Sequence, residues 1–275
     1  MPNTVLVVAN ETLGGRALID AVLKRNEAGD ARFHLVVPRT RPKHGNIIYD
    51  EAVRDAAQVR IDLALGYVGG QGLKATGEVG DPDPFTATMD AIADVRPDEV
   101  IVSTHPLTSS GWLRRDLVER IRAEAGLPVE HVVTDLEREG LPFTVTLAVA
   151  NRTAGSDELL ADLRARADEN PAHLFILVVP QAGKEGRAAA EARAHLHAAL
   201  ECLHGAGMLA AGMIGDPNPY DATMNALQFY KVDAIVISTL GQVSSGWLRA
   251  DLVERVRKTS NLPVDHVMAS ETAKV

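Results

Sequence analysis

The sequence predicts an α/β fold made of two tandem doubly wound domains, each a five-stranded parallel sheet with helices on both faces. Short apolar runs alternate with amphipathic helical patterns along the chain. This alternation is typical of strand–helix–strand units with right-handed crossovers, whose sheets are covered on both sides. In addition, long blocks of sequence occur twice. Because 46% of the residues are hydrophobic but only 4% are aromatic, the predicted cores are mainly aliphatic.

The repeat sets the domain organisation. The block GDPDPFTATMDA at 80–91 returns as GDPNPYDATMNA at 215–226, and SSGWLRRDLVERIR at 109–122 returns as SSGWLRADLVERVR at 244–257, both 135 residues later. The segment VVAN ending at Asn10 matches AVAN ending at Asn151. A repeat of this length is a whole domain rather than a solenoid unit. We therefore expect domains at 1–139 and 140–275, with a charged linker at 134–142.

Each predicted element of the first half follows from a local pattern. A continuous apolar run predicts a buried strand at 4–9, and helical spacing predicts a helix at 16–25. Further elements follow in order: a strand at 33–37 ended by Pro38, a long helix at 49–68 ended by Gly69-Gly70, a strand at 74–78, a helix at 84–94, a strand at 99–103, a helix at 113–125 and a strand at 129–133. The second half repeats this order, with its long helix at 188–204.

Composition excludes several classes of protein. The chain has 275 residues, and 28 Lys and Arg against 37 Asp and Glu give a net charge of −9. Nucleic acid is not expected as a partner, because binding the phosphate backbone needs a basic stripe. The single Cys202 excludes an internal disulfide and a CxxC-type zinc site. No basic leader begins the chain and no apolar run reaches the length of a membrane span, so we expect a cytoplasmic protein without membrane contact.

Candidate binding residues follow from the fold class. In doubly wound sheets, ligands lie outside the carboxyl ends of the strands, at the point where the strand order reverses. That rule selects polar, small and strand-end residues of both halves as a candidate nucleotide or anion site. They are Asn10, Val37, Gly80, Asp81, Ser103, Thr104, Ser109, Ser110 and Gly111 in the first half, and Asn151, Val179, Gly215, Asp216, Ser238, Thr239, Ser244, Ser245 and Gly246 in the second.

Structural roles compete with binding at most of these positions. The Ser-Ser-Gly segments precede a helical pattern, where serines cap a helix start and free N–H groups can also hold a phosphate or carboxylate. Gly-Asp-Pro is equally typical of a turn that opens the next helix. Trp112 and Trp247 are interpreted as packing groups.

Catalytic patterns are absent from the sequence. No nucleophile elbow, HExxH motif or phosphate-binding glycine loop is present. His131 and His266 lie in the last strands and are expected far from the crevice, in structural roles. His105 is near the crevice, but its counterpart is Leu240. We predict a protein that is not an enzyme, with no catalytic residues and no metal site.

Together, the VVAN strand tip, the VVP segments, the GDPxP motifs and IVST before a small-residue loop resemble the universal stress protein family. The resemblance covers both halves, as in a tandem two-domain member. It implies an α/β sandwich, and it implies ATP or another adenine nucleotide as the candidate ligand. It also implies an intramolecular pseudo-dimer through the last strands, 129–133 with 264–268, and leaves a homodimer open.

The chain departs from the family's ATP-binding pattern. Where ATP-binding members have an aspartate at the first strand tip, this chain has Asn10 and Asn151. The glycine signature Gly-x2-Gly-x9-Gly-Ser/Thr is degenerate. Its glycines fall on Pro106, Ser109 and Glu119 in one half, and on Gly241, Ser244 and Glu254 in the other. We therefore expect a non-catalytic stress-response binding protein, the alternatives being a ligand-free protein-interaction module and a nucleotide-handling enzyme.

Overall fold

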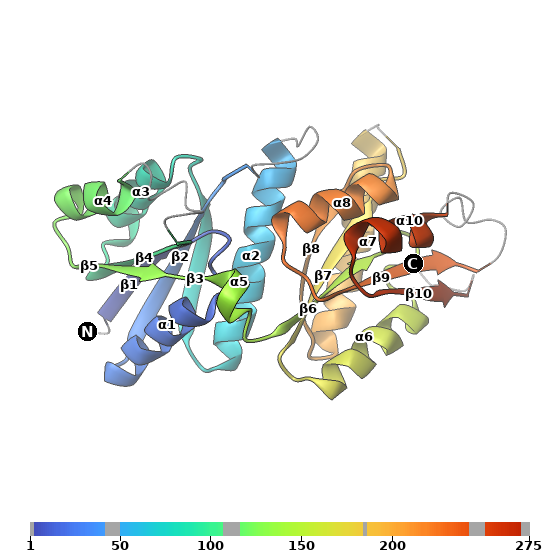
Figure 1. Cartoon of the computed structure of the whole chain (residues 1–275), viewed down its shortest axis with the longest axis horizontal. Coiled ribbons are helices and arrows are strands. Elements are labelled where there is room, and N and C mark those ends of the chain that lie inside the picture. Colours follow the sequence, from blue (N-terminus) through green and yellow to red (C-terminus); the bar gives the residue numbers. More distant parts are fainter. Residues whose placement is uncertain (1–2, 42–49, 107–115, 184–185, 242–250, 271–275) are drawn as a thin grey trace. The chain divides into compact units, whose positions relative to one another are not determined.

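The computed structural model describes residues 3–41, 50–106, 116–183, 186–241 and 251–270. Contacts between Cα atoms divide the chain into two compact units. One comprises Met1–Arg41 and Ala56–Pro142, and the other comprises Pro42–Asp55 and Phe143–Val275. Figure 1 shows the elements of both units. The predicted division at 139/140 stays a prediction, and the second unit's first strand begins at Thr144.

The first unit is a five-stranded parallel sheet in the order β3-β2-β1-β4-β5. Its strands are β1 Asn3–Val8, β2 Ala31–Pro38, β3 Lys74–Gly80, β4 Glu99–Thr104 and β5 Val129–Val133. Its helices are α1 Arg16–Ala28, α2 Asp50–Gly70 from Ala56 onward, α3 Pro84–Val95, α4 Leu117–Ala125 and the short α5 Leu136–Glu139. Alternate residues of the strands bury themselves against different helices. Val5 and Val7 pack with residues of α1 and α2, whereas Leu6 and Val8 pack with residues of α3 and α4. The sheet is therefore covered on both faces, as predicted.

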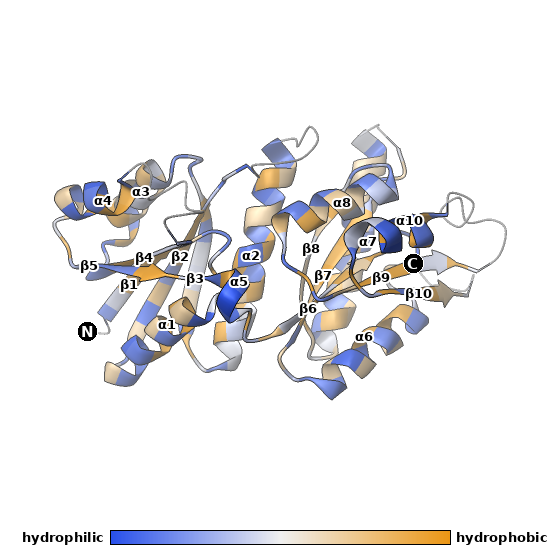
Figure 2. Cartoon of the chain, viewed as in Figure 1, coloured by the Kyte–Doolittle hydropathy of each residue, from blue (hydrophilic) through white to orange (hydrophobic). Residues whose placement is uncertain are grey.

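The second unit repeats this plan in the order β10-β9-β6-β7-β8. Its elements are β6 Thr144–Val149, α6 Asp157–Glu169, β7 His173–Pro180, α7 Gly186–Gly205, β8 Leu209–Gly215, α8 Pro219–Phe229, β9 Ala234–Leu240, α10 Leu252–Ser260 and β10 Val264–Ala269. Phe175 and Leu177 belong to a core formed with α6 and α7, while α8 contacts β7 and β8 and α10 contacts β10. In Figure 2 the strands are mainly hydrophobic and the helices alternate hydrophobic with hydrophilic residues. The predicted α/β class with two doubly wound sheets is confirmed.

Strand register brings the carboxyl ends of three strands together in each unit. Val8 of β1 stands beside Val36 of β2 on one side and Val102 of β4 on the other. In the second unit, Val149 of β6 stands beside Val178 of β7 and Ile237 of β9. The strand order reverses at β1 and at β6, and in this fold ligands bind beyond such strand ends, a region called the crevice below.

Two local differences from the sequence-based expectations have physical causes. The predicted linker contains the helix α5, whose first turn is capped because the Asp135 side chain accepts a hydrogen bond from the Arg138 backbone N–H at 3.2 Å. The fourth helix was expected from 113; residues 113–115 lie outside the described residues, and after them Asp116 has a left-handed conformation (φ 49°) and α4 begins at Leu117. Within the described ranges, no helix combines the length and the apolar character needed to cross a bilayer.

Candidate functional site

Asn10 stands directly beyond β1 with only 7% of its surface exposed. Its side-chain Nδ2 donates a hydrogen bond to the Pro38 carbonyl at 3.3 Å. Since a carbonyl can only accept, this contact fixes which end of the amide is the donor. The other end, Oδ1, is buried and has no hydrogen-bond partner among the described residues.

Asn151 occupies the same place beyond β6 with the same anchor. Its Nδ2 donates to the Pro180 carbonyl at 2.7 Å. Here, however, Oδ1 has a partner, because it lies 3.1 Å from Nδ1 of His195 on α7. The two halves therefore hold the amide in one orientation but differ in what faces its oxygen.

A threonine two residues further on ties each loop to the neighbouring strand. Thr12 Oγ1 donates to the Ser103 carbonyl at 3.3 Å, and Thr153 Oγ1 donates to the Ser238 carbonyl at 3.1 Å. Both threonines are buried. The candidate set missed them, although the pattern Asn-x-Thr occurs at both strand tips in the sequence and is the signal that could have identified them.

The serines that precede the ends of β4 and β9 are buried in both halves but differ in their partners. Ser103 Oγ lies 3.1 Å from Thr134 Oγ1. Ser238 Oγ has no hydrogen-bond partner in the described part of the second unit, where Ala269 stands at the position that matches Thr134. Among the described residues, buried polar atoms without a partner near the strand ends thus include Asn10 Oδ1 in the first half and Ser238 Oγ in the second.

The histidines of the last strands lie at the crevice, which corrects the expectation that they are far from it. His131 stands beside Val102 on the neighbouring strand, and its Nε2 reaches Thr104 Oγ1 at 2.8 Å. His266 Nε2 reaches Thr239 Oγ1 in the same way at 2.9 Å. Parallel pairing of β5 with β4 is the cause, because it carries both strand ends to one edge of the sheet.

The hydroxyl in the first of these pairs also contacts a backbone carbonyl. Thr104 Oγ1 lies 3.0 Å from the His105 carbonyl, to which it can donate its only proton. His131 Nε2 lies 2.8 Å from the same oxygen, so the Thr104 hydroxyl has two neighbouring acceptors for one proton when Nε2 is unprotonated. Burial, with a contribution from Arg122, lowers the pKa of His131 below its usual value, and burial and Arg257 do the same to the pKa of His266.

The rims of the two crevices carry opposite charge. In the first half, His105 Nε2 lies 3.1 Å from the Glu11 carboxylate. The matching residues of the second half are Leu240 and Arg152. Electrostatics alone therefore favours an anion at the second rim more than at the first.

The Gly-Asp-Pro motifs build turns, which supports the structural interpretation of them. Asp81 Oδ1 accepts from the Asp83 backbone N–H at 2.8 Å, and Asp216 Oδ1 accepts from the Asn218 N–H at the same distance. Gly80 and Gly215 allow a helix to approach, since a Cβ on either would lie 2.7 Å from an alanine Cβ on α3 or α8. What these residues can offer a ligand is mainly backbone.

The remaining candidates contribute little that the structure describes. Val37 and Val179 are fully buried, so a ligand could meet only their backbone atoms. The serine-glycine segments lie outside the described residues: Ser109, Ser110, Gly111, Ser244, Ser245 and Gly246, together with Trp112 and Trp247.

The last glycine position of the degenerate signature is occupied in each half by a glutamate that forms an ion pair. Glu119 pairs with Arg122 at 2.7 Å, and the guanidinium of the adjacent Arg120 lies 4.0 Å from the centre of the Phe85 ring. In the second half, Glu254 pairs with Arg257, and Arg255 lies over the Tyr220 ring at 4.1 Å. These cation–π contacts hold α4 to α3 and α10 to α8.

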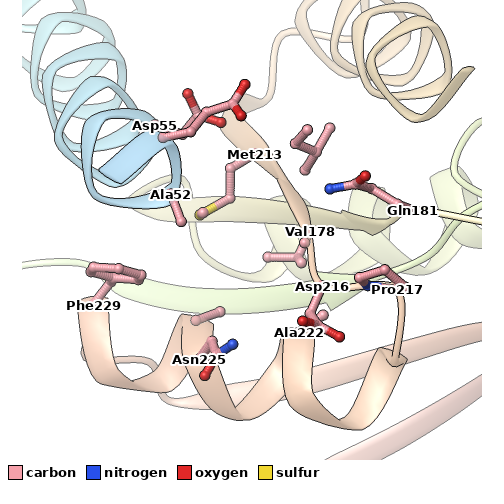
Figure 3. Close-up of a pocket in the computed structure, with 14 residues that line it drawn as sticks. Ala52, Asp55, Val178, Gln181, Met213, Asp216, Pro217, Ala222, Asn225 and Phe229 are labelled. Carbon is pink, nitrogen blue, oxygen red and sulfur yellow. The ribbon is translucent and has the colours of Figure 1, made fainter. Parts of the chain in front are cut away.

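A hollow lies on the α8 side of the second sheet (Figure 3). Val178, Met213 and Phe229 give it an apolar wall, and Gln181, Asp216 and Asn225 line it with polar groups. Ala52 and Asp55, which group with this unit, also line it. Gly215 and Asp216 of the candidate set line it, whereas Asn151 and Thr239 do not. Among the described residues, no group of three or more His, Cys, Asp or Glu could hold a metal ion.

Comparison with known proteins places this geometry in a structural context. The chain is similar to universal stress proteins. A universal stress protein from Archaeoglobus fulgidus matches it with 14% identity over 98% of this chain and 97% of that one, with a TM-score of 0.37. One from Arabidopsis thaliana, with AMP bound, matches with 15% identity over 50% of this chain and 95% of that one, with a TM-score of 0.36.

A third solved structure, a functionally unknown protein from Pseudomonas aeruginosa, shares 17% identity over 98% of this chain and 92% of that one, with a TM-score of 0.31. No family model matches the chain. No curated protein matches it either. Functional conclusions therefore rest on the residues of the crevices themselves.

Proposed function

We propose that the protein is a non-catalytic, universal stress protein-like protein of the stress response that binds an adenine nucleotide or a small anion beyond the carboxyl ends of its strands. The observation that supports this proposal is a buried polar atom without a described partner at the crevice of each half, Asn10 Oδ1 and Ser238 Oγ. Leaving such an atom unpaired costs roughly 1–3 kcal/mol, which a ligand can recover.

An adenine nucleotide supplies the complementary groups. Asn10 Oδ1 is an acceptor, and the ribose hydroxyls and the exocyclic amine of adenine are donors. Ser238 Oγ can donate to an anionic oxygen. The position also fits the general rule that ligands of doubly wound sheets bind at the point where the strand order reverses.

The pairing of side chains in the first crevice supports binding without catalysis. General base catalysis needs a nitrogen or carboxylate that accepts a proton from the nucleophile. The Thr104 hydroxyl has a backbone carbonyl at 3.0 Å as an acceptor for its proton, beside the imidazole of His131 at 2.8 Å. Ser103 is paired with another hydroxyl.

Thermal unfolding with ligands tests the proposed function. A ligand that binds only the folded state raises the melting temperature. We expect ATP, ADP or AMP at millimolar concentration to raise it, with no hydrolysis of the nucleotide over hours. Absence of any shift would exclude nucleotide binding, and measurable turnover would show an enzyme instead.

A second candidate, a protein-interaction module, is favoured by one observation. Val133 on β5 and Met268 on β10 are large hydrophobic residues that are 45% and 63% exposed. Both strands end their sheets, with β4 and β9 as their paired neighbours. End strands can pair with a further strand. The pairing of 129–133 with 264–268 and the homodimer stay predictions, which light scattering of the chain and of its Met268→Lys variant would test.

A further inference from the structure

The two crevices differ at the side-chain oxygen of the asparagine that follows the first strand of each unit. Asn10 and Asn151 are anchored in the same way, through Nδ2 to a proline carbonyl. The oxygen of Asn10 has no described partner, whereas that of Asn151 faces an imidazole nitrogen at 3.1 Å. The difference lies in the long helix rather than in the strand tip.

His195 makes this difference. It lies near the middle of the sequence of α7. The residue at the matching position of α2 is Arg60. His197, two residues along α7 from His195, is largely exposed and pairs with Glu201 at 3.3 Å. Only one of these two histidines therefore turns toward the strand tip.

We propose that His195 acts as a built-in occupant of the second crevice, so that the chain binds one nucleotide, at Asn10, and not two. This inference rests on the proposed function. A donor of the ligand has to come within about 2.7–3.2 Å of the amide oxygen, and the His195 N–H already occupies that distance from Asn151. Displacing it leaves the imidazole N–H without its acceptor, whereas nothing described has to be displaced from Asn10 Oδ1.

The charge at the rims predicts the opposite result, namely binding in the second half, so the experiment can distinguish the two causes. The second half carries Arg152 where the first carries Glu11. If attraction of the phosphate decided the outcome, AMP would bind in the second half. If the free acceptor decides it, AMP binds in the first.

Binding stoichiometry of AMP to the full chain tests the proposal. Equilibrium dialysis should give one AMP per chain for the wild type and two for His195→Ala, because the substitution removes the occupant and leaves the Asn151 oxygen free. His197→Ala, which removes an exposed histidine from the same helix, is the matched control and should bind one. Circular dichroism checks that each variant is folded, and adenosine as a second probe shows whether the phosphate contributes.

Amide shifts identify the occupied half without altering either asparagine. Titration of the ¹⁵N-labelled wild type with AMP should move resonances of residues 9–13 and not those of 150–154, and in His195→Ala those of 150–154 should move as well. Two AMP per wild-type chain, one AMP at 150–154, or one AMP per His195→Ala chain would each overturn the inference while the proposed function stands. Absence of AMP binding in both proteins overturns this inference together with the adenine nucleotide as the ligand in the proposed function.

Discussion

At the scale of single residues, the repeat contains a matched exchange of side-chain size. Gly15 precedes α1, and a Cβ built on it would overlap Cγ2 of Thr134. In the second half the matching residues are Ser156 and Ala269, both buried. The larger member of the pair is Thr134 in the first half and Ser156 in the second. We infer that the space between the helix start and the end of the last strand is filled in both.

This exchange predicts a rescue. Gly15→Ser alone should destabilise the chain by about 1–3 kcal/mol through overpacking, and Thr134→Ala alone by about 1 kcal/mol because Ser103 loses its partner. The double variant should recover most of the loss from Gly15→Ser, since the new serine can cap α1 as Ser156 caps α6. Urea unfolding measures all four proteins, and strictly additive losses would contradict the pairing.

The sequence predicts some of these residues and not others, for physical reasons. Asn10 and Thr104 could be placed because they follow apolar runs, and a strand tip needs no tertiary information. The contact of His131 with Thr104 could not, because it depends on the register between β4 and β5. Likewise, nothing local in α7 distinguishes His195 from His197, as only helix orientation turns one of them inward.

At the scale of elements, the approach of α3 to the sheet depends on the absence of a side chain. A Cβ on Gly80 would lie 2.7 Å from Ala87 Cβ and 2.9 Å from Val36 Cγ1. The second half repeats this between Gly215 and Ala222 at 2.7 Å. The helix and the strand that precedes it therefore pack more closely than any larger residue would allow.

Gly80→Ala should lower the free energy of unfolding by about 1–3 kcal/mol, because α3 must shift from the sheet. Gly29→Ala is the control, since a Cβ there meets nothing within 4 Å and its φ of 170° suits any residue. The control should change stability by less than about 0.5 kcal/mol. Equal effects of the two substitutions in chemical denaturation would show that close packing of α3 is not what requires the glycine.

Element types could be predicted from pattern, whereas their ends depended on contacts. The strand at 129–133 was predicted with its observed limits, because Pro128 and the loss of apolar character bound it. The helix α5 was missed, because four residues are too few to show a helical period, and the segment therefore looks like a charged linker.

At the scale of the whole molecule, each unit has its own core. Phe33 lies in the core that includes Val5 and Ile61, and Phe175 lies in the core that includes Leu159 and Leu203. The two phenylalanines occupy matching positions in β2 and β7. They offer one probe for each unit.

Phe33→Leu and Phe175→Leu should each lower the stability of one unit by about 1–2 kcal/mol. In calorimetry of the full chain, we expect each variant to shift one component of the unfolding trace toward lower temperature and to leave the other in place. A trace that shifts as a whole in both variants would mean that the units unfold together.

The size exchange between Gly15–Thr134 and Ser156–Ala269 also has a consequence for inheritance. The two members of each pair stand near opposite ends of one repeat, so unequal crossing-over between the two copies of the coding sequence would separate them at almost any breakpoint. The shortened product would join Gly15 to Ala269 and leave a void, and the lengthened product would join Ser156 to Thr134 in a clash. The helix start of each copy thus fits poorly against the last strand of the other copy, and this poor fit acts against loss of the duplication.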